Sequence, residues 1–279
     1  MPNEGQKEGP LLKRLSSKVK QASIRYGLFS KGDKLAIALS GGKDSLALVA
    51  LLGTLRGPLQ LDLVAIHIAF PGIGYRVDED ALRQHCTRFG VRLIVHRDEE
   101  VRITPEHERS PCYHCSHQRR NVLFRIVREE RCAAVAFGHH QDDVLETLLM
   151  NMTLHGSVAA MAPRLRMEKD GVTVIRPMCL IRERELAALA AVGGYRADDV
   201  HCPFERVSAR VEFKRVLSRL EEIAPQAAKN IWASMENVKQ EYLPLSASTG
   251  GKRKSKTLAE VAKKVKQESE NVDIEEIIV

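Results

Sequence analysis

A short polar sequence, Ser40-Gly41-Gly42-Lys43-Asp44-Ser45, ends the apolar run 35–40 and opens a helical pattern. Paired glycines let a backbone approach an anion closely, and the start of a helix offers unpaired N–H groups and the positive end of its dipole. Lys43 adds a full positive charge. The spacing differs from that of the Walker A loop, GxxxxGK[ST]. These residues therefore predict a phosphate-binding loop of another kind.

A second polar sequence, Gly138-His139-His140-Gln141-Asp142-Asp143, also stands where an apolar run ends and a helical pattern begins. In open α/β sheets, ligands bind outside the carboxyl ends of the strands, so we expect both sequences to face one crevice. Carboxylates combined with substrate phosphates are the usual ligands of Mg²⁺. The sequence thus predicts a Mg²⁺ and pyrophosphate site, with helix capping by the two aspartates as the alternative.

Cysteines form a third candidate site. Ser110 and Pro111 suit the cap and first position of a helix, so Cys112 and Cys115 are expected on its first turn, sharing one face. The helix dipole there lowers the pKa of a thiol. Cys202 is a candidate third thiolate, and redox, zinc and Fe–S chemistry all fit such a set. The other cysteines stand in apolar or helical contexts and are interpreted as packing residues: Cys86, Cys132 and Cys179.

Short apolar runs alternate with helical patterns along the first half of the chain. Runs at 35–40, 61–70, 92–96 and 133–137 are expected to be strands, each followed by a helix. This order predicts an α/β fold, a doubly wound parallel sheet built from right-handed βαβ units. Outside these units we expect a basic helix at 11–28, a hairpin at 162–178, and a helical C-terminal part with helices at 181–192, 207–222 and 225–241.

Composition is that of an ordinary globular protein. The 279 residues are 44% hydrophobic and 28% charged, and no apolar run approaches the ~20 residues that span a bilayer. With no secretory signal pattern at the first residues, a cytoplasmic location without membrane association is expected. The net charge of +7 is compatible with a polyanionic partner. We expect an N-terminal helix in 1–30, a catalytic domain over 31–245 and a flexible tail from 246 to 279.

The sequence SGGKDS after a strand resembles the signature of the PP-loop ATP pyrophosphatases, which cleave ATP between its α- and β-phosphates and adenylate a substrate oxygen. The resemblance implies the adenine-nucleotide α-hydrolase-like fold. It also implies catalytic roles for Lys43, Asp44 and Asp143, with Asp44 and Asp143 assisting Mg²⁺. The ATP-binding residues that it implies are Ser40, Gly41, Gly42, Lys43, Asp44, Ser45, His67, Ile68, Gly138, His139, Asp142 and Asp143.

From about residue 11 to Pro244 the chain resembles the tRNA 2-thiocytidine synthetases, through SGGKDS, the CxxC and GHHQDDVLETLLMNM. Members adenylate C2 of cytidine 32 in tRNA, and a [4Fe-4S] cluster on three cysteines then delivers sulfur. The resemblance makes Cys112, Cys115 and Cys202 the cluster ligands. Its implied partners are tRNA and a sulfur donor such as a cysteine desulfurase or sulfide, and a homodimer is one expectation for the assembly.

Other interpretations stay open. Lysidine-type tRNA modification shares the ATP loop but needs no cysteine triad, and sulfur insertion or removal on a small molecule or free base uses the same scaffold. A redox-sensing Fe–S RNA-binding module is the non-enzyme alternative. Zinc is the competing metal, and a metal-free persulfide is a third route for sulfur. The arginines that follow the CxxC either meet RNA phosphates or form a solvated helix face: Arg119, Arg120, Arg125 and Arg128.

Overall fold

The computed structural model describes residues 4–70, 77–98, 111–195 and 209–244. The chain divides into two compact units. The first comprises residues 1–144 and 160–208, and the second comprises residues 145–159 and 209–279. The predicted tail 246–279 and Cys202 lie outside the described residues.

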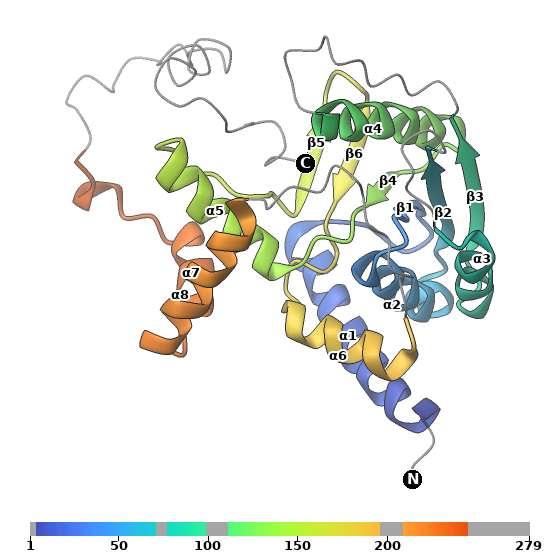
Figure 1. Cartoon of the computed structure of the whole chain (residues 1–279), viewed down its shortest axis with the longest axis horizontal. Coiled ribbons are helices and arrows are strands. Elements are labelled where there is room, and N and C mark those ends of the chain that lie inside the picture. The colour runs from blue at the N-terminus through green and yellow to red at the C-terminus, as the bar shows by residue number, and fades with distance from the viewer. Residues whose placement is uncertain (1–3, 71–76, 99–110, 196–208, 245–279) are drawn as a thin grey trace. The chain divides into compact units, whose positions relative to one another are not determined.

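The first unit is built on a six-stranded sheet in the order β3-β2-β1-β4-β6-β5 (Figure 1). Its strands are β1 (Lys34–Ala38), β2 (Asp62–Ala69), β3 (Arg92–Arg97), β4 (Ala134–Ala136), β5 (Arg164–Met167) and β6 (Val172–Ile175). All neighbours pair in parallel except β5 and β6, which form the predicted hairpin. The chain adds β2 and β3 on one side of β1 and then crosses to place β4 on the other. The expected doubly wound α/β fold is therefore confirmed, with its switch point between β1 and β4.

Helices connect these strands at the positions that the apolar pattern predicts. In the first unit they are α1 (Glu4–Tyr26), α2 (Lys43–Leu59), α3 (Glu79–Arg88), α4 (Pro111–Glu129), the start of α5 (Gln141–Leu154) and α6 (Glu183–Gly193). Asp78 caps α3, because its carboxylate accepts hydrogen bonds from the N–H groups of Asp80 and Ala81. Helices α1, α2 and α6 pack against one another, and α1 and α6 lie side by side (Figure 1).

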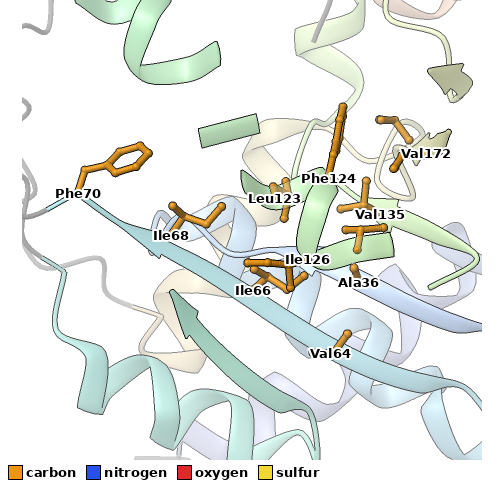
Figure 2. Close-up of a cluster of buried hydrophobic side chains, with 12 residues drawn as sticks. Ala36, Val64, Ile66, Ile68, Phe70, Leu123, Phe124, Ile126, Val135 and Val172 are labelled. Carbon is orange, nitrogen blue, oxygen red and sulfur yellow. The ribbon is translucent and has the colours of Figure 1, made fainter. Parts of the chain in front are cut away.

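One face of the sheet is covered by α4. Alternate residues of β2 point toward this helix because side chains of a strand alternate between the two faces. Figure 2 shows Val64, Ile66 and Ile68 of β2 in one buried cluster with Phe124 and Ile126 of α4. The residues between them, including His67, consequently face the opposite side of the sheet. That opposite side is where the βαβ connections place α2, since consecutive right-handed crossovers in one direction share a face.

The second unit contains the rest of α5, α7 (Ala209–Ile223), α8 (Ala227–Glu236) and the short 3₁₀ helix η2 (Gln240–Tyr242). Helices α7 and α8 pack together. The prediction of one helix over 225–241 is wrong at its end, because α8 ends at Glu236. Asn237 leaves the helical region with φ −131° and ψ 56°. Among the described residues no helix has both the length and the apolar character needed to cross a membrane.

Candidate functional site

The loop between β1 and α2 has the geometry of an anion cradle. Gly41 has φ +92°, a conformation that glycine adopts without the steric cost that a Cβ brings. Gly42 is the N-cap of α2, and the Ser40 hydroxyl accepts its N–H at 3.3 Å. The Ser45 hydroxyl donates to the Gly42 carbonyl at 2.8 Å and lies 3.1 Å from the Ser40 hydroxyl. The turn is therefore held by its own serines. A Cβ on Gly41 would lie 2.7 Å from Val77 Cγ1, so this position has no room for a side chain.

The loop between β4 and α5 begins beside the first one. An ideal Cβ built on Gly138 lies 3.2 Å from the Ser45 nitrogen and 3.3 Å from the Asp44 carbonyl carbon. Ordinary contacts of a Cβ are longer, so a side chain at this position displaces the start of α2. The two polar sequences that the chain separates by almost a hundred residues thus meet at the switch point of the sheet.

The two aspartates after Gly138 have different partners. Asp143 Oδ2 accepts the N–H of His140 at 2.8 Å and lies 3.3 Å from His140 Nδ1. Asp142 accepts two hydrogen bonds from the guanidinium of Arg182, from Nε at 2.9 Å and from Nη2 at 2.8 Å. Its second oxygen accepts the Glu183 N–H at 2.7 Å. Both aspartates lie on the first turn of α5, as predicted.

The pKa of the Asp142 carboxyl follows from these contacts. Burial alone raises the pKa, because it disfavours the charged form. The hydrogen bonds from Arg182 and from the Glu183 N–H outweigh that effect and hold the pKa below its ordinary value. Asp142 is therefore a carboxylate whose two oxygens are committed to the start of α6, which makes it a fastening point between α5 and α6.

Lys43 stands between two carboxylates. Its ammonium lies 2.9 Å from Asp44 Oδ2 and 3.4 Å from Glu183 Oε1. Partial burial lowers the pKa of Lys43, but the two carboxylates more than offset this and raise it. The ammonium is therefore held in its charged form at the mouth of the loop, the form that binds a phosphate.

The residues predicted near the adenosine lie at the end of β2. His67 is buried, and the Leu39 carbonyl accepts a hydrogen bond from its Nδ1 at 2.8 Å. Burial lowers the pKa of His67, so the ring is neutral at pH 7. His67 thus lies directly beside the residue that precedes Ser40. Ile68 points to the other face and packs in the core against α4.

Helix α4 begins at Pro111, as the sequence predicts, and carries Cys112 and Cys115 one turn apart along its backbone. Cys115 is half-buried and packs against the core cluster. Among the described residues there is no group of three or more His, Cys, Asp or Glu side chains placed to hold a metal ion. The packing interpretation of Cys86 and Cys179 is confirmed by their burial, which raises the pKa of these thiols to about 11 and about 12.

The arginines of α4 make contacts within the protein. Arg119 lies over the Phe70 ring at 5.3 Å, and Arg125 pairs with Glu129 at 3.3 Å. Arg128 donates to the Asp170 carbonyl at 2.8 Å and so ties α4 to the β5–β6 turn. Arg120 is half-buried. A structural role therefore accompanies any role that these residues have toward RNA.

Sequence reasoning missed Arg182 and Glu183. Arg182 directly precedes α6 and Glu183 begins it, and the apolar pattern predicts this helix at 181–192. Their partners, Asp142 and Lys43, lie 40 and 140 residues earlier in the chain. The local signal is an N-terminal helix pattern, in which Glu185 accepts the Arg182 N–H at 3.2 Å. That pattern locates the start of α6 without indicating that it meets the phosphate loop.

The fold and the two loops define a PP-loop nucleotide-binding protein, and a family model for the PP-loop domain matches residues 11–199. The tRNA-cytidine(32) 2-sulfurtransferase of Syntrophotalea carbinolica is 35% identical over 245 residues, covering 85% of this chain and 93% of that protein. The enzyme of the same name from Citrifermentans bemidjiense is 34% identical over 239 residues, covering 82% and 92%. The chain belongs to this family of PP-loop enzymes.

A solved structure supports the same assignment. The U34-tRNA thiolase NcsA from Methanococcus maripaludis, described with its [4Fe-4S] cluster, matches with a TM-score of 0.70 and 28% identity. The match covers 90% of this chain and 86% of that one. The expected PP-loop fold and family are therefore confirmed.

Proposed function

We propose that this protein is an ATP-dependent tRNA sulfurtransferase that adenylates C2 of cytidine 32 and replaces the oxygen with sulfur, giving 2-thiocytidine. The observation that carries the proposal is the contact between the loop 40–45 and the loop that starts at Gly138, at the switch point of the sheet. Membership of the sulfurtransferase family names the chemistry.

ATP binding is assigned to the two loops. The N–H groups at the start of α2 and the Lys43 ammonium receive the pyrophosphate part, and Gly41 supplies the positive φ that the turn requires. His67 and the backbone of Ile68 are assigned to the adenosine end beside β2, since the Ile68 side chain packs in the core against α4. Ser40, Ser45, His139 and the two aspartates complete the set. Attack of the cytidine C2 oxygen on the α-phosphorus releases pyrophosphate. Sulfur then adds at C2, and AMP leaves with the oxygen.

Mg²⁺ is assigned to Asp44 and Asp143 together with the ATP phosphates. Their side chains are 29% and 17% exposed, accessible enough to reach an ion that also contacts phosphate. Asp142 is less suited, because Arg182 and the Glu183 N–H occupy its oxygens. The Lys43 ammonium balances charge that develops on the leaving pyrophosphate, a preorganised electrostatic contribution.

The [4Fe-4S] cluster is assigned to Cys112, Cys115 and Cys202, and it supplies the sulfur-transfer site when bound. The helix fits this role, since residues three apart on α4 share a face. The cluster-bearing thiolase neighbour supports the choice of iron–sulfur over zinc. A cysteine desulfurase or sulfide is the proposed donor, a homodimer the proposed assembly and the cytoplasm the proposed location. The catalytic domain is assigned to residues 31–245.

A matched pair of Lys-Asp sequences gives a direct test. Lys43-Asp44 stands in the phosphate loop, whereas Lys169-Asp170 stands at the exposed β5–β6 turn. We expect Lys43→Ala and Asp44→Asn each to reduce tRNA-dependent AMP formation by at least 100-fold, because binding and transition-state contacts are lost while the core is untouched. Lys169→Ala and Asp170→Asn keep the rate.

The same variants are then examined in cells that lack the gene. Mass spectrometry of tRNA nucleosides should show 2-thiocytidine restored by the wild-type protein and by the turn variants but not by the loop variants. AMP formation that persists in Lys43→Ala contradicts the site assignment. Normal 2-thiocytidine in cells without the gene contradicts the proposed function.

A further inference from the structure

Helix α1 from Gly9 onward, together with the residues that follow the helix, forms a basic segment without acidic residues. From Gly9 to Gly32 the chain contains no Asp or Glu and six basic residues: Lys13, Arg14, Lys18, Lys20, Arg25 and Lys31. Their charge of +6 nearly equals the net charge of +7 of the whole chain. The basic excess is thus concentrated in one helix and its C-terminal connection. An ordinary solvated helix face interleaves both signs of charge.

The helix separates its apolar and basic residues cleanly. Leu15, Val19 and Ala22 are fully buried, on the side where α1 packs against α2 and α6. Lys13 and Lys20, seven residues apart, lie on the same outer row and are exposed. Ile24 continues that row and is 75% exposed. The outer row therefore presents ammonium groups together with an aliphatic side chain to solvent.

Only part of the positive charge is used within the fold. Arg14 and Lys18 both pair with Glu185 of α6, at 3.4 Å and 2.6 Å. These two ion pairs hold α1 against α6 and do not involve the outer row that contains Lys13 and Lys20. Over the described ranges, neither Lys13 nor Lys20 has an ion-pair partner. The outer lysines are available to a partner.

The row ends near the carboxyl edge of the sheet. The guanidinium of Arg25 lies over the Tyr26 ring at 5.4 Å. Next to it, a Cβ on Gly27 would lie 3.8 Å from Arg164 Nη1, so the first residue of β5 adds its charge at this end. Arg164 in turn pairs with Ile175, the last residue of β6, whose carbonyl accepts the N–H of Phe137, the residue before Gly138.

The chain that follows β6 leads from Ile175 to the phosphate site. Met178 forms a parallel bridge with His140 of the second loop. The basic end of α1 therefore lies on the side of the sheet where the two loops open. A polyanion bound at the two loops can therefore extend along α1 and remain in contact with positively charged side chains.

We propose that Lys13, Lys20, Arg25 and Arg164 form a basic surface that binds phosphates of the RNA substrate and guides it to the loops at the sheet edge. The inference rests on the proposed function and adds where the RNA lies. Lys13 and Lys20 are about 10 Å apart along the helix axis. That distance allows each lysine to contact a separate phosphate of one nucleic-acid strand. The surface is distinct from α4, whose arginines the sequence had suggested.

The test replaces only the two outer lysines. In Lys13→Gln/Lys20→Gln the helix keeps good helix formers and its buried face, so the fold is retained. The matched control is Arg56→Gln/Arg83→Gln, which removes two exposed charges from α2 and α3, without ion pairs in the described part of the chain. Binding of unmodified tRNA is measured by fluorescence anisotropy from 0.05 to 0.5 M salt. Thermal melting verifies that both variants are folded.

Counterion release sets the expected size of the effect. Each lost phosphate contact reduces the slope of log K against log salt by roughly 0.7 to 0.9, so the double variant loses roughly 1.4 to 1.8. If the contribution vanishes near 1 M salt, this corresponds to about 15- to 30-fold weaker binding at 0.15 M. The KM for tRNA in AMP formation rises by the same factor, while kcat at saturating tRNA and the KM for ATP stay unchanged.

The outcomes separate this inference from the function on which it rests. Wild-type protein with tRNA-dependent AMP formation, combined with an unchanged slope and KM in the lysine variant, overturns the basic surface and leaves the function intact. An equal loss in the arginine control overturns it too, because the effect is then net charge alone. Wild-type protein that neither binds tRNA nor depends on it overturns both. If the lysine variant binds tRNA like the wild type but binds anionic phospholipid vesicles more weakly, the basic surface of α1 is assigned to a membrane instead.

Discussion

The contact between Gly138 and the start of α2 leads to a graded prediction. A Cβ at this position lies 3.2 Å from the Ser45 nitrogen and 3.3 Å from the Asp44 carbonyl carbon, and both are backbone atoms that cannot rotate away. In Gly138→Ala one of the two loops must therefore move by a few tenths of an ångström. Overpacking of this kind costs about 1 to 2 kcal/mol of unfolding free energy.

The functional effect follows from the place of the contact. A misplacement of about 1 Å costs about 100-fold in rate, so a few tenths cost about 3- to 10-fold in kcat/KM for ATP. Gly138→Val adds two methyl groups toward the same backbone, and we expect a loss beyond 100-fold. The assay is tRNA-dependent release of AMP and pyrophosphate, with ATP binding measured separately and stability measured by urea unfolding.

Gly57 supplies the control, because it lies in the same helix, α2, and a Cβ there has nothing within 4 Å. Gly57→Ala should leave kcat/KM unchanged. Its effect on the free energy of unfolding should stay within about 1 kcal/mol, because the gain in helix propensity is opposed by contact of the new Cβ with the ring of Pro58. Full activity in Gly138→Val, in a folded protein, refutes the conclusion that the two loops meet at the nucleotide. If Gly57→Ala loses as much kcat/KM as Gly138→Ala, any change in α2 is harmful and the contact at Gly138 is not the cause.

Two further predictions concern the edges of the site. Arg182→Met should cost about 3 kcal/mol at pH 7, because the buried Asp142 carboxylate loses its guanidinium partner and keeps the Glu183 N–H as hydrogen-bond donor, with His140 Nδ1 at 3.7 Å. In the wild type the pKa of Asp142 is lowered, so its stabilisation is present at neutral pH and is lost as the pH falls through that pKa. In the variant burial raises the pKa of Asp142. The difference in unfolding free energy between wild type and variant, measured with urea, should therefore shrink toward pH 3. Cys202→Ala should abolish the EPR signal of the reduced cluster and the thiolation of tRNA, whereas Cys132→Ala keeps both. Stoichiometric zinc without iron in the anaerobic wild-type protein contradicts the cluster assignment.

Local patterns are enough to predict where the two polar loops lie. Each loop consists of glycines and polar residues directly after a short apolar strand, and the rule for parallel sheets places such loops at one edge. The alternation of strands and helices then gave the order of elements through β4. The hairpin β5–β6 followed from its turn, where Gly171 takes φ +65°. These features depend on neighbours in sequence, which is why sequence patterns indicate them.

Contacts between residues that are far apart in the chain cannot be predicted from local sequence patterns. The Arg182–Asp142 pair forms only because β6 lies next to β4 and Met178 bridges to His140, which brings the start of α6 to the second loop. Nothing in the residues around Arg182 specifies that neighbour. The end of α8 is a smaller case: the apolar spacing continues past Glu236, but the backbone of Asn237 leaves the helix.

The charges around Lys43 affect how the loop 40–45 can receive a triphosphate. Lys43 shares its ammonium between Asp44 and Glu183, and Arg182 holds Asp142, so positive and negative groups alternate across the start of α2, α5 and α6. An incoming triphosphate has to take Lys43 from two carboxylates, and those carboxylates then face the new negative charge. A divalent cation resolves this conflict because it binds carboxylate and phosphate oxygens together. We therefore expect nucleotide binding at these residues to depend on Mg²⁺.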